Sequence, residues 1–331
     1  MPARRSLLSV ALAAGAAVAV AATGGCVQAD VPESLPGPTT STTEEAAPPE
    51  PEPDCGNPVA SLRPTGPATT AVPSDSYMAE IRARGQLRVG VDVATLRLSS
   101  IDPLTGDFEG FDVDIAREVA AALLGDPDAV AFVGIPSSER VSVLVDEPVD
   151  GPVAEQVDLV ASAFTPTCTR RVDIEFSTDY YTSTQDVLLR DDDPAASVAD
   201  LAGRRICASA GTTTLANIAE LPDPAPVPVP AAERADCLVR LQQGEVDGMS
   251  TNDTILAGFL AQDPNLRILD ADLSTEPTAL GLPQGHPEWV RYVNAVLDEV
   301  RTSGRWDQLY DRWLADLLGP SPGPPAPTYL D

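Results

Sequence analysis

The hydrophobic pattern between residues 86 and 318 switches repeatedly between two periods. Apolar residues that recur at every second position, or run together briefly, predict strands. These segments are 86–92, 129–135, 157–163, 186–189, 205–208 and 246–249. Apolar residues three or four positions apart predict helices between the strands, at 110–125, 138–145, 213–218 and 232–243 and in two C-terminal stretches. This alternation predicts α/β architecture with mainly parallel sheets.

Three helical stripes are particularly clear. The first helix has Asp112 and Asp114 in its first turn, where acidic side chains suit the helix dipole. We expect the apolar side chains of the three stripes to face the core: Phe111, Ile115, Val119 and Leu123; Trp289, Val293, Leu297 and Val300; and Trp306, Leu309, Trp313 and Leu317.

Composition excludes several classes of protein. The chain has 331 residues and a formal net charge of −29, which argues against nucleic acid as a partner. All basic residues are arginine, so enzymes that need a lysine for a Schiff base or a phosphate loop are excluded. His286 is the single histidine, which argues against catalytic triads and zinc sites, and we interpret it as a loop or cap residue. We therefore expect no metal and no cofactor.

The N-terminus carries the features of an exported protein. Residues 1–25 combine two arginines with an apolar, alanine-rich run, which is typical of a signal peptide. Thr23-Gly24-Gly25-Cys26 resembles the lipobox of bacterial lipoproteins, so Cys26 is the predicted lipidation site. An ordinary cleaved signal is the alternative. The lipid would hold the protein on the outer face of the cell membrane.

Proline-rich segments flank the predicted folded part. Residues 26–76 are rich in Pro, Thr and Glu and show no sustained periodicity, which predicts an extended spacer. Residues 319–331 form a second proline-rich tail. We therefore expect the fold to occupy residues 77–318. With Cys26 lipidated, an even set of cysteines remains, and it allows three disulfide pairings: Cys55, Cys168, Cys207 and Cys237.

Several segments, in order, resemble family 3 of the extracellular solute-binding proteins, the polar amino-acid receptors of bacterial ABC importers. They are 110–116, 158–170, 176–181, 211–214, 246–254 and 303–313. Within that family the segments 55–64, 78–81, 236–238 and 254–257 are most similar to actinobacterial glutamate/glutamine-binding lipoproteins. The chain departs from this pattern in a lengthened loop at 146–156, in Leu96-Arg97-Leu98, and at Thr95 and Ser137, where some relatives have aromatic residues.

The resemblance implies two α/β lobes joined by two extended hinge strands, which close around a ligand. The first lobe would comprise residues 78–184 and 281–318, and the second residues 185–280. On this arrangement Cys207 and Cys237 belong to one lobe, so the implied disulfides are Cys207–Cys237 and Cys55–Cys168.

The family pattern also implies a ligand site. Arg170 would bind the α-carboxylate, because a guanidinium matches two carboxylate oxygens. The Ala163 main chain, the Thr165 hydroxyl and Thr213 would complete that shell. Asp253 would accept the ammonium group, although a helix cap beside Thr254 is a serious alternative.

Arg140 lies where receptors for acidic amino acids carry a second arginine, so it would bind a side-chain carboxylate. Its less favoured alternative is a solvated helix arginine that pairs with Glu139 or Asp146. Arg97 could also reach the cleft, and for Arg97 the solvated alternative is as plausible as that contact. Asp92, at the end of the first strand, could share the ammonium group or hold a side-chain amide. The remaining predicted ligand contacts are Thr95, Arg97, Ser137, Ser209 and Asn252.

Three functions follow from these residues. The leading one is a monomeric, lipid-anchored receptor that passes glutamate, aspartate or their amides to an ABC permease and does no covalent chemistry. A second keeps the same site but gives it a membrane sensor as partner. A third is a dehydratase with a cleft carboxylate as proton donor; arginines beside the candidate acids disfavour it, because they lower the pKa of a carboxyl group.

Overall fold

The structure of the protein is a computed structural model, which describes residues 53–69, 71–145 and 156–330. All of them fall in one unit, Pro51–Asp331. Cys26, the predicted signal peptide and most of the 146–156 loop lie outside the described residues.

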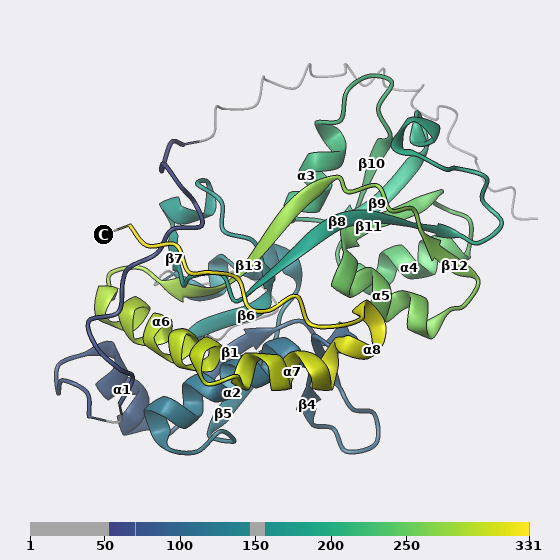
Figure 1. The fold of residues 1–331 in the computed structure, drawn as a ribbon. Helices are drawn as coiled ribbons and strands as arrows, with labels where there is room; N and C mark the ends of the chain where they lie inside the picture. Colours follow the sequence, from purple (N-terminus) through teal and green to yellow (C-terminus); the bar gives the residue numbers. More distant parts are fainter. Residues whose placement is uncertain (1–52, 70, 146–155, 331) are drawn as a thin grey trace, which may run out of the picture. The chain divides into compact units, whose positions relative to one another are not determined.

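Ten strands form the main sheet of the described residues (Figure 1). Eight follow the order β10-β9-β11-β8-β13-β6-β1-β5, while β12 pairs with β8 and β7 pairs with β13. Their bounds are β1 Leu87–Val91, β5 Val130–Gly134, β6 Leu159–Phe164, β7 Ile174–Phe176, β8 Tyr181–Arg190, β9 Arg205–Ser209, β10 Val227–Ala231, β11 Gly248–Asn252, β12 Leu266–Ile268 and β13 Ser274–Pro283. A separate small sheet contains β2 (Ala94–Thr95), β3 (Ser99–Ile101) and β4 (Phe108–Glu109).

Strand directions divide the main sheet into two parallel halves. β1 pairs in parallel with β5 and β6, and β9 pairs in parallel with β10 and β11. Between these halves, the long strands β8 and β13 pair antiparallel with each other. We call the half with β1 the first lobe and the half with β9 the second lobe. The predicted two-lobed α/β class is confirmed, and the predicted lobe boundaries fall within β8 and β13.

The helices pack on the strands as their apolar stripes require. The first lobe carries α1 (Tyr77–Arg84), α2 (Phe111–Leu124), α6 (Pro287–Thr302), α7 (Arg305–Trp313) and α8 (Ala315–Leu318). The second lobe carries α3 (Thr213–Ala219), α4 (Arg234–Gln242) and α5 (Asp253–Gln262). Every residue of the three predicted stripes is buried except Leu317, which is half-buried in α8.

Gly110 sets the start of α2. Its φ of 133° is in the region that favours glycine. A Cβ atom at this position would lie 2.2 Å from the Leu98 carbonyl oxygen, so no other residue fits without moving the backbone.

One predicted element differs from the structure, and β10 is among the elements that the hydrophobic pattern did not predict, together with α1, α5, β7, β12 and β13. Residues 138–145 form two short 3₁₀ turns, η1 (Ser137–Glu139) and η2 (Ser142–Leu144), instead of a helix. β10 was missed because Pro228 and Pro230 interrupt its pattern. Proline is tolerated there because β10 lies at the end of the sheet, where one side of the strand needs no donor.

The prediction that the fold begins at residue 77 is wrong. Residues 53–69 and 71–76, which we call the N-terminal strap, pack on the first lobe. Ser61 is 1% exposed; its hydroxyl donates to the Phe176 carbonyl at 2.7 Å, and its N–H donates to the Thr328 carbonyl of the C-terminal tail at 3.0 Å. The strap and residues 319–330 therefore belong to the folded unit, since backbone and side-chain hydrogen bonds replace regular secondary structure there.

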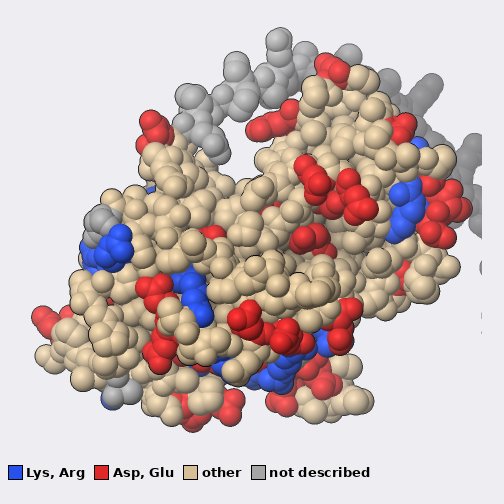
Figure 2. All heavy atoms as spheres, viewed as in Figure 1, with Lys and Arg blue, Asp and Glu red and all other residues tan. Residues whose placement is uncertain are grey.

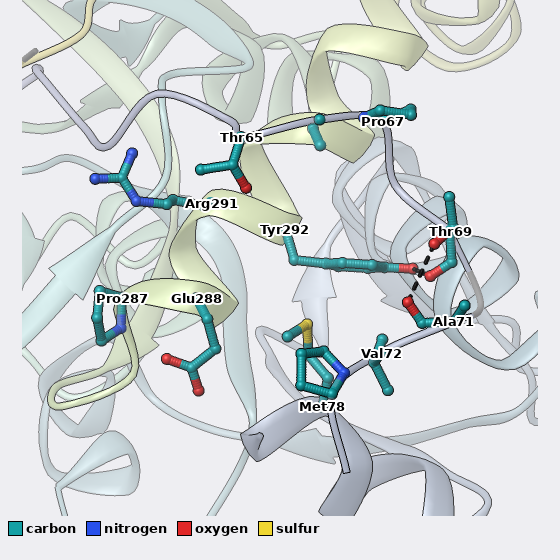
Figure 3. A pocket seen from close by; sticks show the side chains of 13 residues that line it. Thr65, Pro67, Thr69, Ala71, Val72, Met78, Pro287, Glu288, Arg291 and Tyr292 are labelled. Atoms are coloured by element: carbon teal, nitrogen blue, oxygen red, sulfur yellow. Dashed lines mark hydrogen bonds between the residues drawn. The ribbon is translucent and has the colours of Figure 1, made fainter. Parts of the chain in front are cut away.

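A pocket of about 440 Å³ lies between the strap and α6 (Figure 3). Tyr292 reaches across it, and its hydroxyl donates to the Thr69 carbonyl at 3.0 Å. None of the predicted ligand residues lines this pocket.

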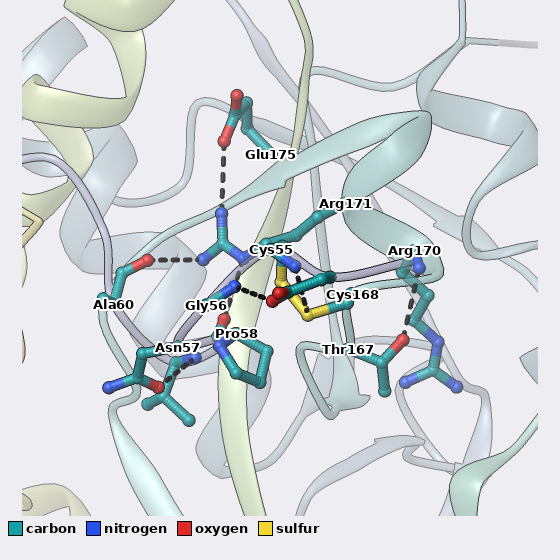
Figure 4. Close-up of a disulfide and its surroundings, with 12 residues drawn as sticks. Cys55, Gly56, Asn57, Pro58, Ala60, Thr167, Cys168, Arg170, Arg171 and Glu175 are labelled. Atoms are coloured by element: carbon teal, nitrogen blue, oxygen red, sulfur yellow. Dashed lines mark hydrogen bonds and ion pairs between the residues drawn. A yellow bond between two sulfur atoms is a disulfide. The ribbon is translucent and has the colours of Figure 1, made fainter. Parts of the chain in front are cut away.

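Both predicted disulfides are present. Cys207 in β9 joins Cys237 in α4, with the Cα atoms 5.5 Å apart. Cys55 of the strap joins Cys168, with the Cα atoms 5.3 Å apart, directly beside Arg171 (Figure 4). Arg171 donates to the Pro58 and Ala60 carbonyls. The Cys55–Cys168 disulfide and the Arg171 hydrogen bonds therefore both fix the strap to the segment that carries Arg170.

Acidic side chains are spread over much of the face in Figure 2, with arginines in smaller groups between them. Within the described part of the chain, no helix is long and apolar enough to cross a membrane. The same residues contain no cluster of His, Cys, Asp and Glu that could hold a metal ion.

Candidate ligand site at the lobe junction

Arg170 begins η3 (Arg170–Val172), shortly after β6 ends. Its guanidinium donates to the Thr165 carbonyl of the first lobe and, at 2.9 Å, to the Gly211 carbonyl of the second lobe. Burial lowers the pKa of Arg170 to about 10, and the negative charge of Glu276 opposes that shift. The side chain predicted to bind the α-carboxylate therefore lies where the two lobes meet.

Arg140 lies at the same place and is 2% exposed. Its Nε donates to the Ser137 carbonyl, and one terminal nitrogen donates to the carbonyls of Ser162 and Ala163 at 3.0 and 3.1 Å. The other reaches the Gly211 carbonyl at 3.4 Å. Burial lowers the pKa of Arg140, and the nearby positive charge of Arg170 lowers it further. The solvated alternative is wrong for Arg140.

The two arginines share one aromatic ring, and among the described residues neither contacts an anionic side chain, although Glu276 acts on both from beyond 4.0 Å. Their Cζ atoms lie 4.6 Å (Arg140) and 4.8 Å (Arg170) from the centre of the Phe164 ring. Neither has a carboxylate oxygen within 4.0 Å among the described residues. Arg140 is buried and Arg170 is half-buried, and a desolvated cation that is bonded only to neutral carbonyls is a favourable place for an anion.

Ala163 has a strained backbone that serves this arrangement. Its φ of 43° is unusual for a residue other than glycine. In this conformation its carbonyl accepts from Arg140, while its N–H donates to Asp112 at 2.9 Å. Asp112 also accepts from the Tyr180 hydroxyl at 2.7 Å, and burial raises the pKa of Asp112 to about 6.

Glu276 in β13 is a junction residue that the sequence analysis missed. It is 2% exposed and accepts the hydroxyl protons of Thr165 at 2.8 Å and Thr213 at 2.7 Å. Both threonines were predicted to bind the ligand carboxylate. In this structure both hydroxyls donate to the Glu276 carboxylate instead. Polar residues surround Glu276 in β13, so no apolar pattern marked this position.

Asp92 pairs with a second missed residue, Arg234 at the start of α4. A guanidinium nitrogen of Arg234 lies 2.9 Å from Asp92 Oδ2, and the side chains are 4% and 3% exposed. The Thr95 hydroxyl donates to Asp92 at 2.9 Å and accepts from Arg234 at 3.2 Å. This buried ion pair joins the first lobe to the second.

Asp253 forms no hydrogen bond or ion pair with either arginine in the described part of the chain. Its carboxylate accepts the Thr254 N–H at 2.6 Å in the first turn of α5, but Asn252 holds the N-cap position, so Asp253 is not the helix cap. Its charge adds to burial in raising the pKa of Tyr181 and Tyr310. The neighbouring Asn252 side chain instead donates to the Ser183 hydroxyl at 2.6 Å.

The other predicted contacts are less closely tied to the arginines. Arg97 is half-buried with a φ of 74°, and no side-chain hydrogen bond or ion pair of Arg97 is formed within the described residues. The Ser137 and Ser209 hydroxyls are buried and have no hydrogen-bond partner in the described part of the chain, so both remain available to a ligand.

The sequence model of the bacterial extracellular solute-binding proteins, family 3, matches residues 87–316. The chain belongs to this family. It is therefore a solute-binding protein and not an enzyme, as the sequence predicted.

Curated relatives agree with this assignment. The chain is 27% identical over 240 residues to the ABC transporter glutamine-binding protein GlnH of Bacillus subtilis, covering 72% of this chain and 85% of the relative. It is 30% identical over 203 residues to the glutamine-binding protein of Geobacillus stearothermophilus, covering 61% and 74%. The glutamate-binding protein GluB of Corynebacterium glutamicum is 24% identical over 261 residues, covering 74% and 82%.

Solved structures show the same fold. A solute receptor for L-cysteine from Neisseria gonorrhoeae superposes with a TM-score of 0.67 at 24% identity, over 73% of this chain and 95% of the receptor. A mutant of the T. maritima protein ArgBP gives a TM-score of 0.64 at 25% identity, over 72% and 99%.

Proposed function

We propose that this protein is a receptor for an acidic amino acid, glutamate or aspartate, that serves ABC-type import. The observation that carries the proposal is the pair of guanidiniums, Arg140 and Arg170, without a carboxylate within 4.0 Å in the described residues. An amino acid with two carboxylates supplies one anion to each. Relatives named for binding glutamine, glutamate, aspartate and asparagine support this class of ligand.

The balance of charge favours an acidic side chain over an amide. Arg234 is already neutralised by Asp92. The α-carboxylate and α-ammonium groups of any amino acid cancel each other, and the negative charge of Glu276 offsets that of Arg170, so Arg140 remains as a surplus cation. A side-chain carboxylate neutralises that charge, whereas an amide leaves it uncompensated.

Calorimetry of two variants tests this function. Arg170→Met should abolish binding of all amino acids, because every ligand has an α-carboxylate. Arg140→Met should weaken glutamate and aspartate by about thirtyfold to several-thousandfold, since an unpaired buried charge costs roughly 2–5 kcal/mol. Glutamine and asparagine should lose less.

Arg205→Met is the matched control, because Arg205 is exposed and pairs with Asp247 within the second lobe. It should bind like the wild type. Wild-type affinity of Arg140→Met for glutamate and aspartate would contradict the acidic specificity and favour an uncharged amide as ligand.

We further propose that a lipid on Cys26 holds the receptor on the outer face of the cell membrane, beside an ABC permease. The support is the Thr23-Gly24-Gly25-Cys26 sequence. Mass spectrometry should find a lipid-sized increment on the N-terminal peptide. Recovery of Cys26→Ala from membranes as efficiently as wild type would refute the anchor.

A further inference from the structure

Glu276 is held in one orientation by four neutral donors. Oε2 accepts from the Thr165 and Thr213 hydroxyls, and Oε1 accepts from Ser274 at 2.8 Å and from the Asn217 amide at 3.0 Å. No arginine nitrogen lies within 4.0 Å of this carboxylate among the described residues. A buried carboxylate without a cation is as incomplete as a buried guanidinium without an anion.

The other carboxylates near the junction already have their partners or face elsewhere. Asp92 pairs with Arg234. Asp112 is occupied by the Tyr180 hydroxyl and the Ala163 N–H. Asp253 accepts from the backbone at the start of α5. Glu276 is the carboxylate of this group that lies against the ligand-site threonines and has no cation within 4.0 Å in the described part of the chain.

Thr165 lies between Arg170 and Glu276 and contacts both of them. Its carbonyl accepts from Arg170, and its hydroxyl donates to Glu276. An α-amino acid carries its own opposite charges on either side of one carbon atom. The described residues therefore offer an anion site and a cation site that both border Thr165, as the two charges of a zwitterion require.

We propose that Glu276, and not Asp253, accepts the α-ammonium group of the ligand. This inference rests on the proposed function, since it requires an amino-acid ligand. Thr165, Thr213, Ser274 and Asn217 then act as positioning residues, because they orient the carboxylate that the ammonium group meets.

Comparing glutamate with glutarate isolates the contribution of the ammonium group to binding, because glutarate keeps both carboxylates and lacks the ammonium group. Calorimetry of Glu276→Gln should show glutamate binding about tenfold to 150-fold weaker, the loss expected for a hydrogen bond to a charged group. Glutarate should bind Glu276→Gln at least as tightly as it binds the wild type, because a repelling carboxylate has been removed. Asp253→Asn is the matched control and should keep glutamate binding within about threefold.

Three outcomes would overturn the inference. An equal loss of glutamate and glutarate would show that Glu276 only supports the fold. Wild-type glutamate affinity in Glu276→Gln, or the loss in Asp253→Asn instead, would return the ammonium site to α5 while the proposed function stands. Failure of the wild type to bind any amino acid would overturn both proposals together.

Discussion

The ion pair between Asp92 and Arg234 should control how tightly the receptor holds any ligand. It joins the end of β1 in the first lobe to α4 in the second, over 2.9 Å, and both side chains are buried. If the lobes separated, water would hydrate both groups. We therefore expect the pair to stabilise the closed arrangement of the lobes more than the folding of either lobe.

Arg234→Met leaves the Asp92 charge buried and unpaired in the closed arrangement alone. Removing one partner of a buried ion pair costs about 3–5 kcal/mol. If ligand binding requires closure, affinity should fall by about 150-fold to 4,000-fold. The loss should be similar for glutamate, aspartate and their amides, in contrast to the selective effect of Arg140→Met.

A double-mutant cycle read by calorimetry isolates this effect. Asp92→Asn with Arg234→Met removes both charges, so the double variant should recover most of the affinity that Arg234→Met loses. Arg204→Met is the matched control, because Arg204 pairs with Asp193 in the second lobe alone. Losses in the two single variants that simply add in the double variant would refute the reasoning.

Three further predictions concern stability. Burial raises the pKa of Asp112 from 3.8 to about 6, so Asp112 adds up to about 3 kcal/mol to the free energy of unfolding below pH 4, and this contribution is lost as the pH rises through 6. Urea unfolding at several pH values should show this pH dependence in the wild type, and Asp112→Asn should remove it. Cys55→Ser with Cys168→Ser should lower the free energy of unfolding by about 5 kcal/mol, and Cys207→Ser with Cys237→Ser by about 4, because the closed loops span 113 and 30 residues; a larger loss from the second pair would contradict the chain-entropy reasoning. Asn294→Leu should cost about 3 kcal/mol in the same assay and expose the strap to protease, because the Asn294 amide donates to Ser61 Oγ at 2.8 Å and to the Leu62 carbonyl at 2.7 Å.

Hydrophobic periodicity predicted the parts of the fold that bury apolar side chains. The stripe from Phe111 to Leu123 lies on α2 as expected, and β1, β5, β6 and β9 lie within two residues of their predicted bounds. The strap was missed because its proline-rich composition indicates a lack of secondary structure, which is not a lack of packing. Ser61 shows the difference, since it is buried by hydrogen bonds to Phe176 and Thr328 without belonging to a helix or a named strand.

The ligand site was harder to predict because it is assembled from polar residues of distant segments. Arg140 and Arg170 were predicted as ligand contacts through family resemblance and lie together at the lobe junction, whereas no local pattern indicated Glu276 or Arg234. A one-residue difference also matters at the end of β11, because successive side chains of a strand point to opposite faces. Asn252 therefore contacts Ser183 near Glu276, whereas Asp253 lies toward Tyr181 and Tyr310.

On the proposed function, Gly211 would link recognition of the ligand to closure of the lobes. Its carbonyl in the second lobe accepts from both first-lobe arginines, Arg140 and Arg170. Its φ of 71° favours glycine, and a Cβ atom there would lie 2.9 Å from Ser138 Cα of the first lobe. The two guanidiniums can therefore reach the second lobe only because no side chain intervenes. A neutral carbonyl compensates a buried guanidinium weakly, so an anionic ligand between these arginines stabilises the same arrangement that brings Gly211 against them. The overall charge of −29 does not oppose this, because surface carboxylates beyond about 8 Å are screened at physiological salt, whereas Arg140 and Arg170 act at contact distance.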